Sequence, residues 1–205
     1  TLVATQNLVL TVHPSLPAKS VRELVKFAKS RPGQLTFASA GNGTGSHLSG
    51  ELFKLLAGVE LLHIPYKGVA PALVDVISGQ VSMSFPSILT SLAQVNSGRL
   101  RALAVTGAHR SSALPDLPTM QETGIKGYES ATWYGIVAPS ATPPEIVNRL
   151  SAEVAAILKQ PDTRERIARD GADPVGNSPQ EFGRFMHSEI EKWRKVIRAA
   201  GIQPG

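Results

Sequence analysis

The sequence predicts an α/β fold built around a parallel sheet. Segments typical of strands alternate with segments typical of amphipathic helices from residue 35 to residue 107, as they do in βαβ units. The length of 205 residues is enough to bury a core in one large domain or two small ones. Because aromatic residues make up only 5% of a composition that is 42% hydrophobic, we expect that core to be mainly aliphatic.

The N-terminal part is expected to begin with a strand at residues 7–12, whose sequence is NLVLTV. A helix over residues 21–33 follows, because apolar residues recur there at helical spacing between Ser20, a good N-cap, and Gly33, a helix stop. Beyond it the expected elements alternate, with strands at 35–40, 60–66, 81–85 and 100–107 and helices at 47–58, 70–79 and 87–98.

After Gly107 the pattern gives way to a segment rich in proline and glycine, residues 108–130, with one short helical candidate, TMQET at 119–123. An irregular connection of this length is usually functional or a domain boundary. A strand is expected next, at 131–139, and then helices at 142–160, 161–171 and 178–201. These helices have little sheet of their own, so we expect them to pack on strands at 1–11 and 131–138 or on elements absent from this chain.

Composition excludes several functions. The net charge is +5, but the basic residues are scattered among acidic ones at helical spacing, which is typical of solvated helix faces, so no nucleic acid partner is predicted. The chain has no cysteine, and its five histidines fall in no ligand spacing, so no metal and no cofactor are predicted. No catalytic motif is present, and no apolar run approaches the ~20 residues of a membrane span.

The segment SAGNGTGSH, residues 39–47, lies between a predicted strand and a predicted helix. A helix N-terminus attracts anions, because its first N–H groups have no intrahelical partner and carry a partial positive charge. A P-loop is disfavoured because no lysine occurs between Gln34 and Lys54. A dinucleotide fingerprint is disfavoured because the glycines follow the spacing G-x-G-x-G rather than G-x-G-x-x-G.

Two interpretations of this loop remain. It is either a cradle for a carboxylate or another small anion, formed by backbone N–H groups and the polar side chains of Ser39, Asn42, Thr44 and Ser46, or a plain turn in which Ser46 caps the helix. A nucleophile–base pair of Ser46 with His47 is disfavoured because neighbouring helical side chains do not face each other. The residues alone do not choose between the cradle and the turn.

Three stretches, residues 35–85, 98–129 and 133–154, together resemble the substrate-binding proteins of tripartite tricarboxylate transporters, the TctC or Bug family. The resemblance covers nearly the whole chain in the family's order. It implies a periplasmic-binding-protein-like fold of type II, with two βαβ domains that close on a small carboxylate such as a dicarboxylic, amino or aromatic acid. It also implies a periplasmic location, delivery of the ligand to a membrane permease, and no enzymatic activity.

The loop and the resemblance together supply the candidate ligand-binding residues. The segment HIPYKG corresponds to a family loop that brings a tyrosine to the cleft, although a turn aromatic packing on the next helix is an equal alternative for Tyr66. Pro86 and Ser87 stand where family members usually carry an acidic or amide residue, which favours plain carboxylates over ligands with an amino group. The full set is Ser39, Ala40, Gly41, Asn42, Gly43, Thr44, Ser46, His47, Tyr66, Pro86 and Ser87.

The family also opens with a strand and a glycine-rich loop of the PFxxGG kind, which supplies the other half of the carboxylate clamp, and residues 1–20 contain no match. We therefore expect a complete ligand-binding second domain at 12–128 and an incomplete first domain at 1–11 and 129–205. Such a chain is expected to bind ligand weakly and to self-associate through exposed apolar surface. An effector-binding regulatory module of similar fold and, less favoured, a nucleotide-binding enzyme stay open as alternatives.

Overall fold

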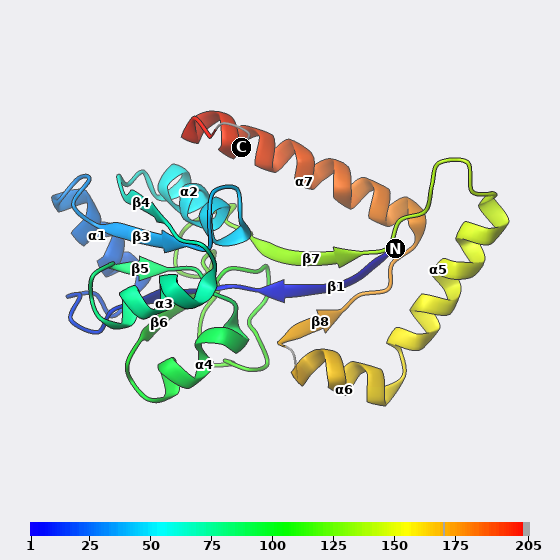
Figure 1. The fold of residues 1–205 in the computed structure, drawn as a ribbon, viewed down its shortest axis with the longest axis horizontal. Helices are drawn as coiled ribbons and strands as arrows, with labels where there is room; N and C mark the ends of the chain where they lie inside the picture. The colour runs from blue at the N-terminus through cyan, green and yellow to red at the C-terminus, as the bar shows by residue number, and fades with distance from the viewer. Residues whose placement is uncertain (170, 203–205) are drawn as a thin grey trace. The chain divides into compact units, whose positions relative to one another are not determined.

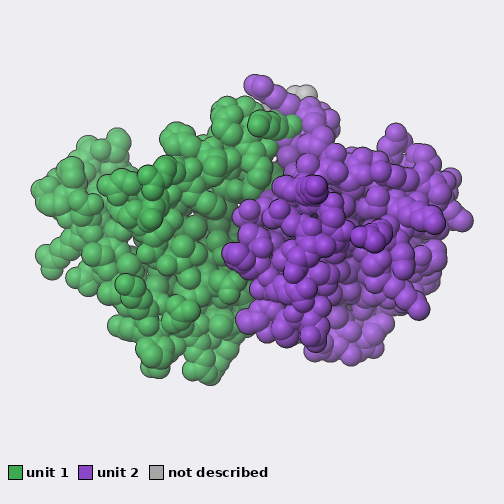
Figure 2. All heavy atoms as spheres, turned by 180° about the vertical axis from the view of Figure 1, so that it is seen from behind, with its two compact units in different colours: residues 1–6, 132–195 green, residues 7–131, 196–205 purple. Residues whose placement is uncertain are grey.

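The computed structural model describes residues 1–169 and 171–202, which form two compact units (Figures 1 and 2). Unit 1 consists of residues 1–6 and 132–195, and unit 2 consists of residues 7–131 together with the end of the last helix. These bounds differ from the expected boundary at residue 12, because the strand at residues 9–12 pairs within the sheet of unit 2.

Unit 2 contains a five-stranded sheet in the order β4-β3-β5-β2-β6. Its strands are β2 (Val9–Val12), β3 (Thr36–Ser39), β4 (Leu62–Pro65), β5 (Met83–Ser84) and β6 (Arg101–Val105). The parallel sheet expected from the alternation of strands and helices is confirmed for β3, β4 and β5. β2 lies outside the alternating segment from which the parallel sheet was predicted. It is inserted between β5 and β6 and runs antiparallel to both. No local pattern indicates that a strand before the first helix pairs with strands so far along the chain.

The sheet of unit 2 carries helices on both faces (Figure 1). The helices are α1 (Val21–Ser30), α2 (Gly45–Ala57), α3 (Val69–Ile77) and α4 (Ile88–Asn96). Neighbouring residues of a strand point to opposite faces, so Phe37 and Ala38 mark the two sides of β3. α2 packs on the Phe37 side so closely that a Cβ on Gly50 would lie 2.2 Å from the Phe37 ring. α3 packs on the other side, where Ala72 and Val76 form a buried cluster with Ala38.

The irregular segment that follows β6 is fixed to α2. The fully buried Tyr128 donates its hydroxyl to the carbonyl oxygen of Ser49 (3.0 Å), and the hydroxyl oxygens of Ser130 and Ser49 lie 2.7 Å apart. The short helix expected at 119–123 is a turn instead. Thr119 and Glu122 do exchange the two hydrogen bonds of a capping box, but Gly124 follows with a φ of 103°, which ends the helical geometry.

Unit 1 contains a three-stranded sheet in the order β7-β1-β8. Its elements are β1 (Leu2–Asn7), β7 (Ala131–Gly135), α5 (Pro144–Leu158), α6 (Pro161–Arg169), β8 (Ala172–Pro174) and α7 (Pro179–Ala200). β8 was not predicted, because its three residues, Ala-Asp-Pro, lack the β-branched and aromatic side chains that identify strands. α7 packs on β7 through edge-on contacts of Phe182 and Phe185 with the Trp133 ring.

The helix α5 leaves its apolar residues largely in solvent. Only Leu158 of its 15 residues is buried, while Ile146, Leu150 and Ile157 are each about half exposed. In the part of the chain that the structure describes, no helix combines the length and the apolar character needed to cross a membrane.

Candidate functional site

The candidate site lies at one edge of the sheet of unit 2. β3, β4 and β5 are parallel, so their carboxyl ends meet at the same edge, and each strand leads through a short loop into the N-terminus of a helix. The loops after β3 and β4 lie side by side, because the backbone N–H groups of Tyr66 and Gly68 donate to the carbonyl oxygens of Ser39 and Ala40, both at 3.0 Å. In open α/β sheets, ligands bind at this edge.

The helices that begin at this edge carry no acidic residue in their first turn, and this holds for α2, α3 and α4 alike. Elsewhere in the described chain, α1, α5, α6 and α7 each carry one, namely Glu23, Glu145, Asp162 and Glu181. A carboxylate in the first turn stabilises a helix by neutralising its partial positive charge. The three helices at the candidate site therefore forgo that stabilisation and keep the positive potential unneutralised.

The N-terminus of α2 is also without a side-chain cap. Its N-cap residue Thr44 makes no capping bond and donates its hydroxyl to the carbonyl oxygen of Gly41 instead (2.7 Å). At α3 the N-cap residue is Gly68, which has no side chain to offer. The first-turn N–H groups of both helices thus lack the acceptors that Ser20 supplies for α1 and Ser87 for α4.

Most of the hydroxyls that the sequence predicts at the site hold the loop in shape. Ser39 Oγ accepts from the N–H of Gly41 (3.2 Å), and Ser46 Oγ accepts from the N–H of Ala40 (3.0 Å). Ser39 is only 1% exposed, whereas Asn42 and Gly43 are exposed at the tip. Gly41 and Gly43 have φ values of 137° and 73°, which L side chains rarely adopt, so both positions require glycine. What the loop presents outward is mainly backbone.

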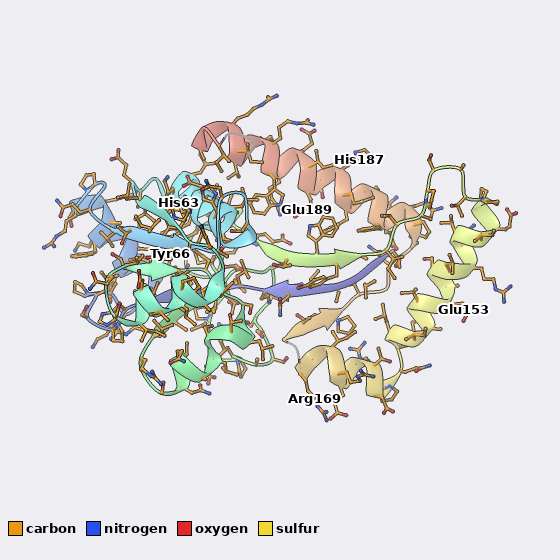
Figure 3. All side chains as sticks on the ribbon, in the orientation of Figure 1. His63, Tyr66, Glu153, Arg169, His187 and Glu189 are labelled. Atoms are coloured by element: carbon orange, nitrogen blue, oxygen red, sulfur yellow. The ribbon has the colours of Figure 1, made fainter. Side chains whose placement is uncertain are left out.

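Tyr66 lies beside the loop, but its hydroxyl is directed elsewhere. The hydroxyl donates to Asp75 Oδ2 of α3 at 2.6 Å, and the ring packs against the cluster around Ala38. Figure 3 labels Tyr66 and His63 in unit 2. Burial and this hydrogen bond to a carboxylate raise the pKa of Tyr66 to about 12. The arrangement is that of the turn aromatic considered as the alternative, with the backbone of Tyr66 rather than its hydroxyl next to the glycine loop.

Pro86 and Ser87 occupy the loop after β5, at the same edge of the sheet. Pro86 is buried, and its carbonyl oxygen accepts from the N–H of Val9 (2.9 Å). The hydroxyl of Ser87 caps α4 by accepting from the N–H of Thr90 (3.3 Å). Both residues therefore have structural partners within unit 2.

Behind the loop, the imidazole rings of His47 and His63 stack with their centroids 3.8 Å apart and their planes 8° from parallel. His47 Nδ1 accepts from the N–H of Gly43 (3.0 Å), and His63 Nε2 lies 2.6 Å from Ser39 Oγ. The ring of Phe37 also stacks on His63, with the two ring centroids 4.8 Å apart. His63 was missed in the sequence, although a parallel alignment of β3 with β4 places it beside Phe37 on the same face.

Burial keeps both imidazoles uncharged at neutral pH. It is the main cause that lowers the pKa of His63 to about 4, and the positive charges of His47, when that ring is protonated, and of Lys54 act in the same direction. Burial also lowers the pKa of His47, with Glu51 opposing the shift. Glu51 is itself buried and is neutralised by Lys54, whose Nζ lies 2.7 Å from a carboxylate oxygen.

The close contact between Ser39 and His63 resembles a nucleophile and its base, but the geometry does not suit catalysis. Ser39 is buried, and its oxygen already accepts the N–H of Gly41, so no substrate carbon can approach it. Across residues 1–169 and 171–202, no three His, Cys, Asp or Glu side chains gather closely enough to hold a metal ion.

A cavity of about 630 Å³ lies elsewhere in unit 2, lined among others by Pro14, Arg101, Leu114 and Asp116. Arg101 begins β6, which runs parallel to β5, so this cavity lies at the edge of the sheet opposite to the glycine loop. The guanidinium of Arg101 already donates to the carbonyl oxygens of Leu16 and Ala18 (3.2 and 3.0 Å). The Arg101 guanidinium is therefore already engaged in hydrogen bonds within the fold.

Comparison with known proteins identifies similar sequences along the whole chain. The family model described as "Tripartite tricarboxylate transporter family receptor" (TctC) matches residues 1–202. A UPF0065 protein from the tcbD-tcbE intergenic region of Pseudomonas sp. strain P51 is 39% identical over 197 residues, which are 96% of this chain and 59% of that protein. Protein BugT of Bordetella pertussis is 35% identical, over 98% of this chain and 62% of its own length. The chain thus spans about 60% of these relatives.

Solved structures with the same fold include two that hold carboxylates. Rpa4515 of R. palustris, solved with adipate, matches with a TM-score of 0.84 and 41% identity over 100% of this chain and 68% of its own. MatC (Rpa3494) of Rhodopseudomonas palustris, solved with bound malate, matches with a TM-score of 0.75 and 28% identity over 96% of this chain and 68% of its own. The periplasmic-binding-protein-like α/β fold expected from the sequence is confirmed, as is the family resemblance.

Proposed function

This chain belongs to the tripartite tricarboxylate transporter receptor (TctC) family, and from that premise we propose that it captures a small organic carboxylate in the periplasm for delivery to a transporter permease. The observation that carries the proposal is the absence of acidic residues from the first turns of α2, α3 and α4. Their unneutralised N-termini meet at one edge of the sheet and form a positive potential there.

The carboxylate is proposed to bind the backbone N–H groups that begin α2. Gly41 and Gly43 turn the loop, and the residues from Ala40 to Ser46 form its surface. Ser39 and His47 are proposed to hold the loop in position rather than to contact the ligand, since both are buried and accept hydrogen bonds from loop N–H groups. Tyr66, Pro86 and Ser87 form the neighbouring rim of the same sheet edge.

The ligand class is proposed to be plain carboxylates, with aliphatic dicarboxylates first. A related protein binds adipate and another binds malate, both dicarboxylates with no ammonium group. A charged ammonium bound at the loop would need an acidic partner, and the first turns that meet there contain none. Amino acids are therefore expected to bind more weakly than dicarboxylates of similar length.

The chain is proposed to act without catalysis, to meet a permease of the tripartite tricarboxylate type, and to have no nucleic acid partner. It is also proposed to self-associate at high concentration, which the half-exposed Ile146, Leu150 and Ile157 of α5 support.

Isothermal titration calorimetry of the chain with adipate, malate and adipamide tests the central part of this proposal. Adipamide has the length of adipate but no charge, so it is the matched control. We expect weak binding of the two carboxylates and none of the diamide, because an anion gains more from the helix N-termini than a neutral amide does. Equal affinity for adipate and adipamide, or no heat with either carboxylate at millimolar concentration, would contradict the proposal.

A further inference from the structure

We propose that His47 is an uncharged replacement for the capping carboxylate of a helix, which holds the glycine loop in place while keeping negative charge out of the anion site. This inference rests on the proposed function, because it concerns how the loop stays attractive to a carboxylate. It assigns a positioning role to a buried side chain that does not itself touch the ligand.

The helix α1 shows the usual solution. Ser20 is its N-cap and accepts from the N–H of Glu23, the third residue of the helix (3.2 Å). The Glu23 carboxylate in turn accepts from the N–H of Lys19, the residue before the N-cap (2.6 Å). This is a capping arrangement in which a carboxylate satisfies a backbone N–H and neutralises the helix N-terminus together.

The helix α2 repeats the same arrangement with a different acceptor. Thr44 is its N-cap, His47 is the third residue of the helix, and the donor is the N–H of Gly43, the residue before the N-cap. His47 Nδ1 lies 3.0 Å from that nitrogen, so the imidazole takes the place that the carboxylate of Glu23 has in α1. The backbone N–H is satisfied, but no negative charge is added.

A closely related arrangement occurs in α7 and in the turn after Thr119, where the donor is the N–H of the residue at the N-cap position itself rather than of the residue before it. There, Glu181 accepts from the N–H of Ser178 (2.8 Å), and Glu122 accepts from the N–H of Thr119 (2.7 Å). At these three places, where the structure forms no candidate anion site, the acceptor is a carboxylate. At the glycine loop it is a neutral ring.

The surroundings of His47 keep the ring neutral and fixed. It is 5% exposed and stacks on His63 of β4. The charged groups facing it are Glu51 and Lys54, both on α2, which pair with each other at 2.7 Å. Protonation at Nδ1 would remove the lone pair that accepts the N–H of Gly43, so only the neutral ring can hold the loop.

Substitutions at position 47 separate the capping role from the charge. His47→Gln supplies a neutral acceptor of similar reach, His47→Glu supplies a charged one, and His47→Ala supplies none. We expect the amide of Gly43 to stay protected from hydrogen exchange in the Gln and Glu variants and to lose protection in the Ala variant. We expect the affinity for adipate, followed by NMR titration, to stay within about threefold of native in His47→Gln and to fall roughly tenfold or more in His47→Glu.

A role in folding alone predicts a different result, because it would leave His47→Glu and His47→Gln equally able to bind adipate. That result, or full protection of Gly43 in His47→Ala, would overturn the proposal. If His47→Glu does not fold, the pair Ser46→Asp and Ser46→Asn places the same charge difference one residue earlier in the first turn, and the Asp variant is expected to bind adipate roughly tenfold more weakly. A native chain that binds neither adipate nor malate would refute the proposed function itself, whereas native binding with equal Glu and Gln variants refutes only the role of His47.

Discussion

The stacked imidazoles of His47 and His63 predict that the chain loses stability as the pH falls below neutral. In the unfolded chain a histidine titrates near ~6.5. In the folded chain the pKa of His63 is lowered to about 4, mainly by burial and in addition by the positive charges of protonated His47 and of Lys54. Between these two values the unfolded state binds a proton that the folded state does not, so the free energy of unfolding decreases as the pH falls from ~6.5 towards 4.

The magnitude follows from the difference between the two pKa values. The difference between a pKa of ~6.5 and one of about 4 would correspond to roughly 3 kcal/mol for a ring fully removed from water. His63 is only half-buried, and solvent screening reduces the expected effect to about 1–2 kcal/mol. His47, whose pKa is also lowered, adds to the loss in the same direction.

Urea denaturation at pH 7 and at pH 4.5 measures how much unfolding free energy the chain loses. Two variants separate the contribution of His63 from that of the carboxylates, which also titrate in this range. His63→Gln removes the half-buried ring, and His187→Gln removes an exposed histidine of α7 as the matched control. We expect the native chain and His187→Gln to lose about 1–2 kcal/mol more than His63→Gln between the two pH values. An identical loss in all three proteins would refute the idea that His63 is held neutral by burial.

Three further predictions concern packing. Gly50→Ala should cost about 2–3 kcal/mol in urea denaturation, because its Cβ would lie 2.2 Å from the ring of Phe37, whereas Gly183→Ala, with nothing within 4 Å, should cost nothing. Equal effects would contradict the close approach of α2 to β3. Tyr128→Phe should cost about 1 kcal/mol by the same measurement, because it removes a buried hydrogen bond, and an unchanged midpoint would count against that bond. Leu150→Lys should shift the chain towards monomer in sedimentation velocity, since this side chain is 54% exposed, and an unchanged distribution would show that association uses another surface.

The sequence predicted what local patterns determine. The positions of the helices along the sequence were predicted well, because apolar periodicity marks their buried faces and residues such as Ser20 and Gly58 mark their ends. The position of β2 between β5 and β6 was not predictable in this way, since strand order depends on contacts between segments far apart along the chain. The same limit applies to His63, which becomes part of the candidate site only through the pairing of β4 with β3.

At the candidate site, residue types were a better guide to location than to role. The loop lies at a helix N-terminus, as predicted, whereas the residues alone left open whether Thr44 and Ser46 face a ligand or shape a turn. In the structure their hydroxyls bind the loop itself. A Ser or Thr hydroxyl can hydrogen-bond equally well to a ligand or to a neighbouring backbone group, so the sequence alone cannot separate the two roles. The absence of acidic residues from the first turns was readable in the sequence, but its meaning depends on the parallel strands that bring those turns to one edge.

The most direct test of carboxylate binding at the glycine loop is an NMR titration of the labelled chain with adipate and, separately, with adipamide. Adipate is expected to shift the amide resonances of Gly45, Ser46 and His47, which begin α2, while the amides of Lys19 and Glu23 at the N-terminus of α1 stay unchanged because Glu23 already neutralises that helix. Adipamide is expected to shift neither group. Shifts at α1 equal to those at α2, or shifts with adipamide equal to those with adipate, would contradict a specific anion site at this loop.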